Sequence, residues 1–349
     1  MLNSNLYDKN LIETINNIKD IHVLENKSIL ITGATGLIGS AIIDTLVYAN
    51  INNNLNINIY VAARNEDKVR SRFEQSYDKE FFNFIKYDAN DDVEFDFKVD
   101  YIIHAASNAH PLAYSEQPVE TMLSNFNGMN NLLQYARKNQ VTRTLYISSS
   151  EVYGQKEGNE PYNENDYGFI DILNPRACYP SSKRAAETLC ASYKKEYEMD
   201  VVVVRPGHIY GPTMTQNDSR ASAQFARNII NRQNIIMKSP GLQLRSYCYV
   251  FDCVSAILTV LLNGVSGEAY NISNRDSVIT IRKLAENFAK NNMSKIVFEN
   301  PDDNEVLGYN MMSCSALDSS KLEGLGWRGL YKVDEGVRMT VEILKENFK

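Results

Sequence analysis

One glycine-rich stretch, residues 27–40 (KSILITGATGLIGS), restricts the fold of this chain more than any other feature. Ile29 to Ile31 form an apolar, mostly β-branched run, which is typical of a buried parallel strand. The run ends at Gly33, and apolar residues at helical spacing follow at once. A strand, a glycine turn and a helix in this order present free backbone N–H groups and a helix N-terminus to a pyrophosphate. The stretch therefore predicts a dinucleotide-binding unit.

The three glycines of this turn have separate expected roles. Gly33 permits the tight turn, Gly36 lets the backbone approach the phosphates, and Gly39 lets the helix pack closely on the strand. Leu37 and Ile38 begin the helix and belong to the expected cofactor contacts. Ordinary strand–helix turns also contain glycines at this spacing, so the prediction depends on the strand before and the helix after.

Strand and helix patterns alternate through the first 211 residues. Further strands are expected at 57–61, before 87–88, and at 101–105, 143–149 and 201–204, and long helices at 119–137 and 179–197. An asparagine-rich loop, residues 50–56, is expected before the second strand. This alternation indicates the α/β class, with a doubly wound parallel sheet of the Rossmann type and right-handed crossovers.

The pattern divides the chain into three parts. Residues 1–26 form an N-terminal extension whose small helix is expected outside the core, and residues 27–211 form the dinucleotide-binding domain. Residues 212–349 have shorter elements and are expected to form a smaller α/β substrate-binding lobe, although strands and helices can cross between the two. Helices of this lobe are expected at 221–231, 252–262, 280–290 and 333–346.

Composition excludes several functional classes. The formal net charge of -7 and the pI near 5.3 argue against a nucleic-acid partner, which requires clustered basic residues. No apolar run approaches the roughly 20 residues of a membrane span, and the N-terminus lacks a signal pattern, so a cytoplasmic protein is expected. The five cysteines are odd in number and form no CxxC pair, which favours buried thiols over disulfides or metal ligands.

A tyrosine and a lysine four residues apart are the first candidates for catalysis. Tyr179 and Lys183 lie on one face of an expected helix. A free phenol has a pKa of about 10, and a nearby cation favours the phenolate. Such a pair is common by chance, but Ser148 to Glu151 follow the fifth strand at the edge that borders the ligand crevice of these sheets. A serine hydroxyl there can bond a substrate oxygen while the tyrosine takes or returns its proton.

Four motifs together resemble a known family. They are the Thr-Gly-x-x-Gly-x-x-Gly turn, residues 104–107 (HAAS), residues 148–154 (SSSEVYG) and Tyr-x-x-x-Lys. The chain resembles the extended short-chain dehydrogenase/reductase family, the NAD-dependent epimerase/dehydratases of nucleotide sugars, from about Lys27 to Asn347. Residues 106–111, 174–179 and 183–190 are most similar to segments of UDP-glucuronate decarboxylases.

The resemblance implies roles for individual residues. Ser149 aligns with the catalytic Ser/Thr, Tyr179 with the base, Lys183 with its partner and Glu151 with an active-site acid. The implied cofactor contacts beyond the glycine turn are Arg64, Asp88 at the adenine, Ala105, Ala106, Ser107, Lys183, and Asn125, which would support the active-site helix. The implied substrate contacts are Ser150, Arg176, His208, Arg220 and Arg245, the last on the nucleotide diphosphate. Guanidinium groups suit phosphate oxygens, although an exposed arginine is often only solvated.

Three positions depart from the family pattern. Arg64 stands where an acidic residue normally binds the ribose 2′-hydroxyl. Its side chain could instead bind the 2′-phosphate of NADP or stack on the adenine ring. His208 replaces an asparagine common near the substrate, and a lone histidine is often structural. Ser150 stands where 4,6-dehydratases carry aspartate beside glutamate, which disfavours water elimination because that step needs an acid and a base.

The sequence therefore predicts an enzyme with NAD or NADP that acts on a nucleotide-diphosphate sugar. In one hypothesis C4 is oxidised transiently, the keto sugar is decarboxylated or epimerised, and the same cofactor returns the hydride. In the second, NADPH reduces a keto sugar once; a silent dinucleotide sensor is a remote third. A homodimer through helices 119–137 and 179–197 is expected from the resemblance. The second helix carries an apolar stripe that a monomer could also bury: Ala185, Ala186, Leu189 and Tyr193.

Overall fold

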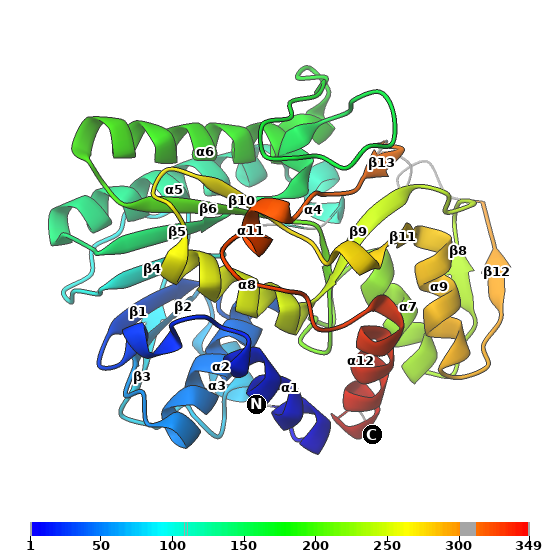
Figure 1. Cartoon of the computed structure of the whole chain (residues 1–349), viewed down its shortest axis with the longest axis horizontal. Helices are drawn as coiled ribbons and strands as arrows, with labels where there is room; N and C mark the ends of the chain where they lie inside the picture. The colour runs from blue at the N-terminus through cyan, green and yellow to red at the C-terminus, as the bar shows by residue number, and fades with distance from the viewer. Residues whose placement is uncertain (1, 108, 110, 301–311, 348–349) are drawn as a thin grey trace.

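The computed structural model describes residues 2–107, 109, 111–300 and 312–347 (Figure 1). A parallel sheet of seven strands forms its centre, in the order β10-β6-β5-β4-β1-β2-β3. The strands are β1 (Ser28–Thr32), β2 (Asn58–Ala63), β3 (Phe82–Lys86), β4 (Tyr101–His104), β5 (Arg143–Ile147), β6 (Val201–Pro206) and β10 (Ala269–Ile272). The strand order reverses between β1 and β4, where such sheets open a crevice for ligands. The predicted doubly wound sheet is confirmed.

Two layers of helices cover the sheet, and strand alternation decides which residues face which layer. The helices are α1 (Asn5–Asn16), α2 (Leu37–Asn53), α3 (Glu66–Arg72), α5 (Pro118–Asn139), α6 (Cys178–Tyr197) and α8 (Val250–Asn263). Ile29 and Ile31 pack into the core shared with α2 and α8, whereas Leu30 packs with Leu132 of α5. Helices α5 and α6 form the layer above the sheet in Figure 1, and helices α2 and α8 belong to the layer below it.

Helix α1 is part of the core, so the expectation that it lies outside is wrong. Tyr7 and Leu11 are fully buried, and the Tyr7 ring meets Phe251 of α8 edge-on at 5.2 Å. The Tyr7 hydroxyl donates to Asp44 of α2 at 2.5 Å, and Arg72 of α3 pairs with the same carboxylate. The apolar stripe of α1 therefore closes the core between α2 and α8, and a buried polar contact fixes its position.

The loop expected in the asparagine-rich segment, residues 50–56, is shorter than predicted, because α2 continues to Asn53. The Asn50 side chain, still inside the helix, bonds both backbone groups of Ile57: its amide donates to the carbonyl at 2.8 Å, and its oxygen accepts from the N–H at 2.7 Å. These bonds let the helix end close to the start of β2. Asn54 ends it in a left-handed conformation, with φ of 55°.

The C-terminal part has smaller sheets. Strands β9 (Leu244–Tyr249), β11 (Val278–Thr280), β13 (Cys314–Ser315) and β7 (His208–Tyr210) form one, and β8 (Ile235–Met237) pairs with β12 (Ile296–Phe298). The helices here are α7 (Ala221–Ile230), α9 (Ile281–Lys290), α11 (Ser320–Glu323) and α12 (Val333–Asn347). Strand β10 crosses back to the large sheet (Figure 1). The division at residue 211 stays a prediction.

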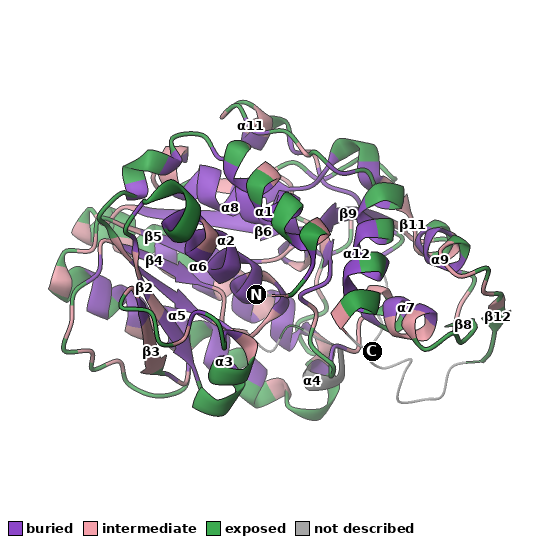
Figure 2. Ribbon diagram, turned by 90° about the horizontal axis from the view of Figure 1, so that it is seen from below, coloured by how far each residue is buried: buried purple, intermediate pink, exposed green. Residues whose placement is uncertain are grey.

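Further short elements lie between the strands and the longer helices. They are η1 (Ile21–Leu24), α4 (Pro111–Glu116), η2 (Ser150–Tyr153), η3 (Pro175–Ala177) and η4 (Arg275–Ser277). Figure 2 shows the central strands buried and the outer helix faces exposed. All five cysteines are free and buried, as predicted. Within the described ranges, no helix is long and apolar enough to cross a membrane, and no group of metal-ligating side chains is found.

Candidate active site

The glycine turn has the geometry of a cradle for phosphates. Gly33 has φ of +67°, and a Cβ there would lie 2.6 Å from the Ala105 carbonyl oxygen. A Cβ on Gly39 would lie 2.3 Å from the Gly33 oxygen. Gly36 is the N-cap of α2 and offers no side chain to the first helical amides, at Leu37 and Ile38. These amides can therefore donate to an anion at the positive end of the helix.

A buried threonine and histidine, which open two of the family motifs but were given no role from the sequence, hold the loop after β4 against this turn. Thr32 and His104 are paired neighbours on β1 and β4. Burial lowers the pKa of His104 to about 3, so the ring is neutral and its Nδ1 can accept from the Thr32 hydroxyl at 2.8 Å. The Thr32 oxygen accepts from the N–H groups of Ala105 and Ala106, each at 3.2 Å. Both side chains stand at the carboxyl ends of strands, and this position in the sequence could have indicated that they lie near the site.

Asn125 contacts α6, the helix that carries Tyr179. Its amide donates to Ser182 of α6 at 3.0 Å, and its oxygen accepts from the Ser107 hydroxyl at 2.8 Å. Ser182 in turn donates to the Cys178 carbonyl at 2.7 Å, inside the first turn of α6. This chain links the loop after β4 to the start of the helix that carries Tyr179. Its contribution to turnover stays a prediction.

Tyr179, Lys183 and Ser149 lie at the carboxyl end of β5. Tyr179 and Lys183 are both buried, at 5% and 2% exposure, on the first two turns of α6. The Lys183 ammonium donates to the Ile147 carbonyl at 2.8 Å and lies 5.8 Å from the centre of the Tyr179 ring. Ser149 caps η2 by accepting from the Glu151 N–H at 3.2 Å, and it also interacts with the Tyr179 hydroxyl. The three catalytic candidates are therefore together.

Burial dominates the protonation of this pair. Burial, together with the smaller effect of the Glu151 charge, raises the pKa of Tyr179 to about 12, and the Ser149 hydroxyl, the Arg220 charge and the Tyr114 hydroxyl oppose the rise. Burial also lowers the pKa of Lys183 to about 7, against the opposing effect of Glu187. The expectation that the lysine would favour the phenolate is not met, because desolvation of the buried phenolate outweighs it. At neutral pH Tyr179 is a proton donor unless a further positive charge is bound beside it.

Glu151 is held by an arginine from the loop before α6. Arg176 of η3 meets the Glu151 carboxylate with two nitrogens, each at 3.0 Å, and both side chains are largely buried. The two-point contact fixes the direction of the carboxylate. Ser150, the first residue of η2, is 5% exposed beside them. The structure therefore brings Ser149, Ser150, Glu151 and Arg176 to one edge.

The C-terminal part contributes two arginines and a histidine. Arg220, at the start of α7, forms a forked pair with Asp218, with Nε at 2.9 Å from Oδ1. Arg245 of β9 is 3% exposed and donates to the Leu244 carbonyl at 3.0 Å. Burial and these two positive charges lower the pKa of His208 to about 3, so its Nε2 meets the Ser315 hydroxyl at 3.2 Å as a neutral group. Both arginines therefore lie close enough to His208 to affect its charge, and Arg220 also lies close enough to affect Tyr179.

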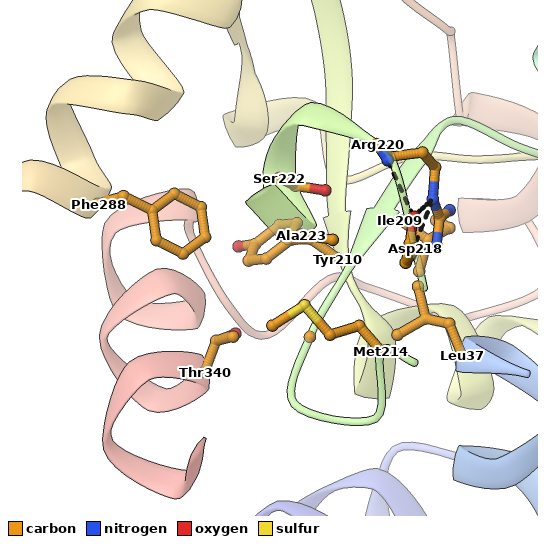
Figure 3. A pocket seen from close by; sticks show the side chains of 11 residues that line it. Leu37, Ile209, Tyr210, Met214, Asp218, Arg220, Ser222, Ala223, Phe288 and Thr340 are labelled. Atoms are coloured by element: carbon orange, nitrogen blue, oxygen red, sulfur yellow. Dashed lines mark hydrogen bonds and ion pairs between the residues drawn. The ribbon is translucent and has the colours of Figure 1, made fainter. Parts of the chain in front are cut away.

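Figure 3 shows a small pocket between Arg220 and the start of α2. The Asp218 carboxylate turns toward the Arg220 guanidinium at its edge, and Leu37 closes it from the cofactor side. The other lining residues come from β7, the loop after it, α7, α9 and α12: Ile209, Tyr210, Gly211, Met214, Ser222, Ala223, Phe288 and Thr340. The pocket therefore lies between Leu37, at the start of α2, and Arg220.

Arg64 and Asp88 follow β2 and β3 at the same sheet edge as the glycine turn. Arg64 is exposed, and no hydrogen bond or ion pair of its side chain is found in the part of the chain that the structure describes. The Asp88 carboxylate accepts from the Asn90 N–H at 3.0 Å and is half-buried. The Ala34 N–H donates to the Ala62 carbonyl, which ties the turn to β2. The contact of both side chains with the adenosine end of a dinucleotide stays a prediction.

Comparison with known proteins gives a family match. The sequence model of the NAD dependent epimerase/dehydratase family matches residues 29–273. UDP-glucuronic acid decarboxylase 1 of Xenopus tropicalis is 28% identical over 336 residues, which cover 95% of this chain and 75% of that protein. The dTDP-D-glucose 4,6-dehydratase of Homo sapiens is 31% identical over 335 residues, with 92% and 91% coverage.

Solved structures agree in fold. An epimerase of Methanothermobacter thermautotrophicus has a TM-score of 0.81 at 20% identity, covering 99% of this chain and 96% of that one. The dTDP-glucose 4,6-dehydratase of Streptomyces venezuelae, solved with NAD bound, has a TM-score of 0.79 at 23% identity, with 92% and 97% coverage. At these identities the likeness establishes the architecture and leaves the reaction open.

Proposed function

The chain belongs to the NAD-dependent epimerase/dehydratase family, and from this premise we propose that it oxidises C4 of a nucleotide-diphosphate sugar transiently and then returns the hydride. The predicted family resemblance is thereby confirmed, and so is a nicotinamide dinucleotide, NAD or NADP, as cofactor. The observation that carries the proposal is the convergence of Tyr179, Ser149 and Lys183 beside the Glu151–Arg176 pair at the carboxyl edge of the sheet.

The residues present fit the cofactor. The glycine turn is a cradle that any Cβ on Gly33 or Gly39 would fill, and the first amides of α2 face it. Gly33, Gly36, Leu37, Ile38 and Gly39 would hold the pyrophosphate. Bound there, the cofactor supplies the hydride acceptor and a cationic nicotinamide ring. Asp88, Ala105, Ala106, Ser107 and Lys183 would complete its contacts.

Proton transfer is the task of Tyr179 and Ser149. The Ser149 hydroxyl would bond the C4 oxygen of the sugar, and Tyr179 would take the hydroxyl proton as C4 becomes a ketone. Tyr179 would return that proton in the second half of the reaction. The raised pKa of Tyr179, about 12, suits the return of the proton to the C4 oxygen. The positive charge of a nicotinamide ring bound beside Tyr179 would favour removal of the proton.

Two outcomes follow from a C4 ketone. A sugar acid with its carboxylate at C5 becomes a β-keto acid and loses carbon dioxide without a further base, and a sugar without that group can receive the hydride on the opposite face as an epimer. Glu151, fixed by Arg176, faces the reacting end, whereas Arg220, Arg245 and His208 would bind the diphosphate end. The similarity to decarboxylases supports the first outcome.

A reductase is the second candidate, and Arg64 favours it. An exposed arginine directly after β2 can accept a 2′-phosphate, which suits a reaction supplied by NADPH. A silent sensor is a weaker third, because the catalytic residues are all present. Dehydration is disfavoured by Ser150, although the human dehydratase is 31% identical. A serine hydroxyl cannot replace the aspartic acid that protonates a leaving hydroxyl at neutral pH.

A substrate panel tests the proposal. The purified protein would be incubated with UDP-, CDP-, GDP- and dTDP-sugars, with and without NAD or NADPH, and products identified by mass spectrometry and NMR. We expect decarboxylation or epimerisation of one nucleotide sugar without net consumption of cofactor. Stoichiometric NADPH consumption would favour the reductase instead. Release of water with formation of a 4-keto-6-deoxy sugar would contradict the role given to Ser150.

We also propose a cytoplasmic homodimer. The exposed apolar row lies on α5, at Val119, Met122, Leu123 and Phe126, which are 40 to 62% exposed at helical spacing. In the α6 stripe Ala186 is buried in the subunit core, whereas Ala185, Leu189 and Tyr193 are half-buried. A dimer through α5 and α6 would cover the α5 row. Light scattering across protein concentration tests this, and the double variant Met122→Glu with Leu123→Glu should give a monomer; a native mass of one chain at every concentration would rule the dimer out.

A further inference from the structure

We propose that Tyr114 is a positioning residue for the catalytic tyrosine: its ring fixes the ring of Tyr179, and its hydroxyl interacts with the Tyr179 oxygen. The inference rests on the proposed function of Tyr179. Tyr114 is on α4, in a segment that sequence analysis did not single out. Its role was invisible there because α4 is short and 65 positions separate the two tyrosines.

The two rings form a buried stack. Their centroids are 4.6 Å apart, their planes are 22° from parallel, and each residue is only 4 to 5% exposed. With Cys178 they form a small apolar cluster of their own. The Cys178 thiol contacts the Tyr114 carbonyl at 3.8 Å, which ties α4 to the first turn of α6. A stacked aromatic partner restricts a ring that must meet the substrate in one orientation.

The stack continues from Tyr114 to Arg176. The guanidinium carbon of Arg176 lies 4.5 Å from the Tyr114 ring centroid, a cation–π distance, while the same guanidinium holds Glu151. Tyr114 therefore connects the arginine that fixes the acid with the tyrosine that acts as base. Burial raises the pKa of Tyr114 well above its ordinary value, so its hydroxyl stays protonated and can donate.

Donation to Tyr179 favours its ionised form, because a phenolate accepts hydrogen bonds more strongly than a phenol. The groups that face Tyr179 from the elements packed around it are Ser149, Glu151, Tyr146, Arg220, Lys183 and Tyr114. Among these, Tyr114 and Ser149 contribute neutral hydroxyls, and both lower the pKa of Tyr179. Tyr114 thus assists the removing step of the reaction by acting on Tyr179.

The first test measures the ionisation of Tyr179 directly, and needs no substrate. Protein with carbon-13 at the tyrosine Cζ would be titrated with NAD bound, and the Tyr179 resonance assigned by its loss in Tyr179→Phe. In Tyr114→Phe, which keeps the ring and removes the hydroxyl, we expect the Tyr179 pKa to rise by about 0.5 to 1, as loss of one hydrogen bond predicts. The control Tyr135→Phe removes a buried hydroxyl on α5 that donates to the Phe97 carbonyl, and should leave the Tyr179 pKa unchanged.

The second test separates the ring from the hydroxyl by kinetics. The acidic limb of the kcat/KM profile should move to higher pH in Tyr114→Phe while the plateau rate is kept. In Tyr114→Leu the plateau kcat should fall by about ten- to a hundredfold, because the Tyr179 ring is no longer held, with little change in KM. A rise in KM alone would show instead that Tyr114 binds substrate.

The outcomes distinguish this inference from the proposed function. The Tyr179 resonance could behave identically in the native protein and in Tyr114→Phe at every pH, or it could fail to titrate in both. Either result overturns the role of Tyr114, whether or not a substrate is known. Absence of turnover by native protein on every sugar contradicts the proposed function alone. A native plateau rate in Tyr114→Leu overturns the positioning role of the ring.

Discussion

The cofactor side and the substrate side of the candidate site are built from different groups. On the cofactor side the contacts come from backbone: the amides at the start of α2, the Gly33 turn and the loop at Ala105 and Ala106. On the substrate side they come from charged side chains, such as Arg176 paired with Glu151 and Arg220 paired with Asp218.

This difference determines how each side can change. A backbone cradle requires close approach of main-chain atoms, so one added methyl group damages it wherever the chain is tight. Side-chain pairs can be exchanged one charge at a time, and each exchange changes which ligand fits. We therefore expect the cofactor side to tolerate few substitutions and the substrate side to tolerate more. Tyr179 lies where the two sides meet.

The largest expected effect is at that junction. Tyr179→Phe should keep the fold and cofactor binding but lower kcat by a factor on the order of 10² or more, because Tyr179 is the group proposed to exchange the C4 proton. Circular dichroism and the NAD dissociation constant control for folding and binding. Near-native turnover of the true substrate would show that the role assigned to Tyr179 is wrong.

The next effect tests the rigidity of the cofactor side. Gly39→Ala places a Cβ 2.3 Å from the Gly33 carbonyl oxygen, so the turn must open. Overpacking of this kind costs about 1–3 kcal/mol, equivalent to about five- to 150-fold in affinity for NAD. The matched control is Gly158→Asn, in an exposed bend with nothing within 4 Å of an added Cβ and with positive φ that asparagine tolerates. Equal NAD affinity in both variants would contradict the cradle.

The same contrast explains how much the sequence could predict. Most strands and helices begin and end within a few residues of their expected bounds, because apolar periodicity and glycine turns are local signals. The glycine turn and the Tyr179–Lys183 spacing were predictable for the same reason. Asn125 was found only through the family resemblance.

What could not be predicted depends on contacts between distant segments. The burial of α1 requires Tyr7, Asp44 and Arg72 to meet, and no local pattern shows this. The pairing of Arg220 with Asp218 was hidden in a loop, although the two residues are close in sequence. The raised pKa of Tyr179 follows from burial, which only the packed site determines.

A smaller effect concerns Lys183, which belongs to both sides. Its pKa falls from 10.5 in a free side chain to about 7 in the fold, so between these values the unfolded chain binds more protons. Stability must therefore rise with pH through this window, by about 2 kcal/mol between about pH 7 and about pH 9. Urea unfolding of native protein without cofactor should show the rise, and Lys183→Met should lose it. Parallel pH profiles in the two proteins would contradict the buried, weakly basic lysine.

The smallest expected effect concerns Arg64, an exposed charged side chain proposed to act on the cofactor side. A ribose 2′-phosphate carries a charge of about −1.5 to −2 if it behaves like other phosphate monoesters, and Arg64 can offer it charge-assisted hydrogen bonds. Such bonds are worth roughly 1.5–3 kcal/mol, so a preference for NADP(H) over NAD(H) of about tenfold or more is expected where the contact forms.

Arg64→Asp should reverse that preference, and dissociation constants for all four cofactor forms measure it. The control is Lys68→Asp, which makes the same change of net charge on an exposed position of α3 one turn away. Because long-range charge effects are screened by salt, only a direct contact should distinguish the two variants. A native preference for NADP(H) that Arg64→Asp removes and Lys68→Asp keeps would favour the reductase. Tighter NAD in the native protein, unchanged by Arg64→Asp, would remove both the contact and the main argument for the reductase, and would leave an enzyme that recycles its own NAD.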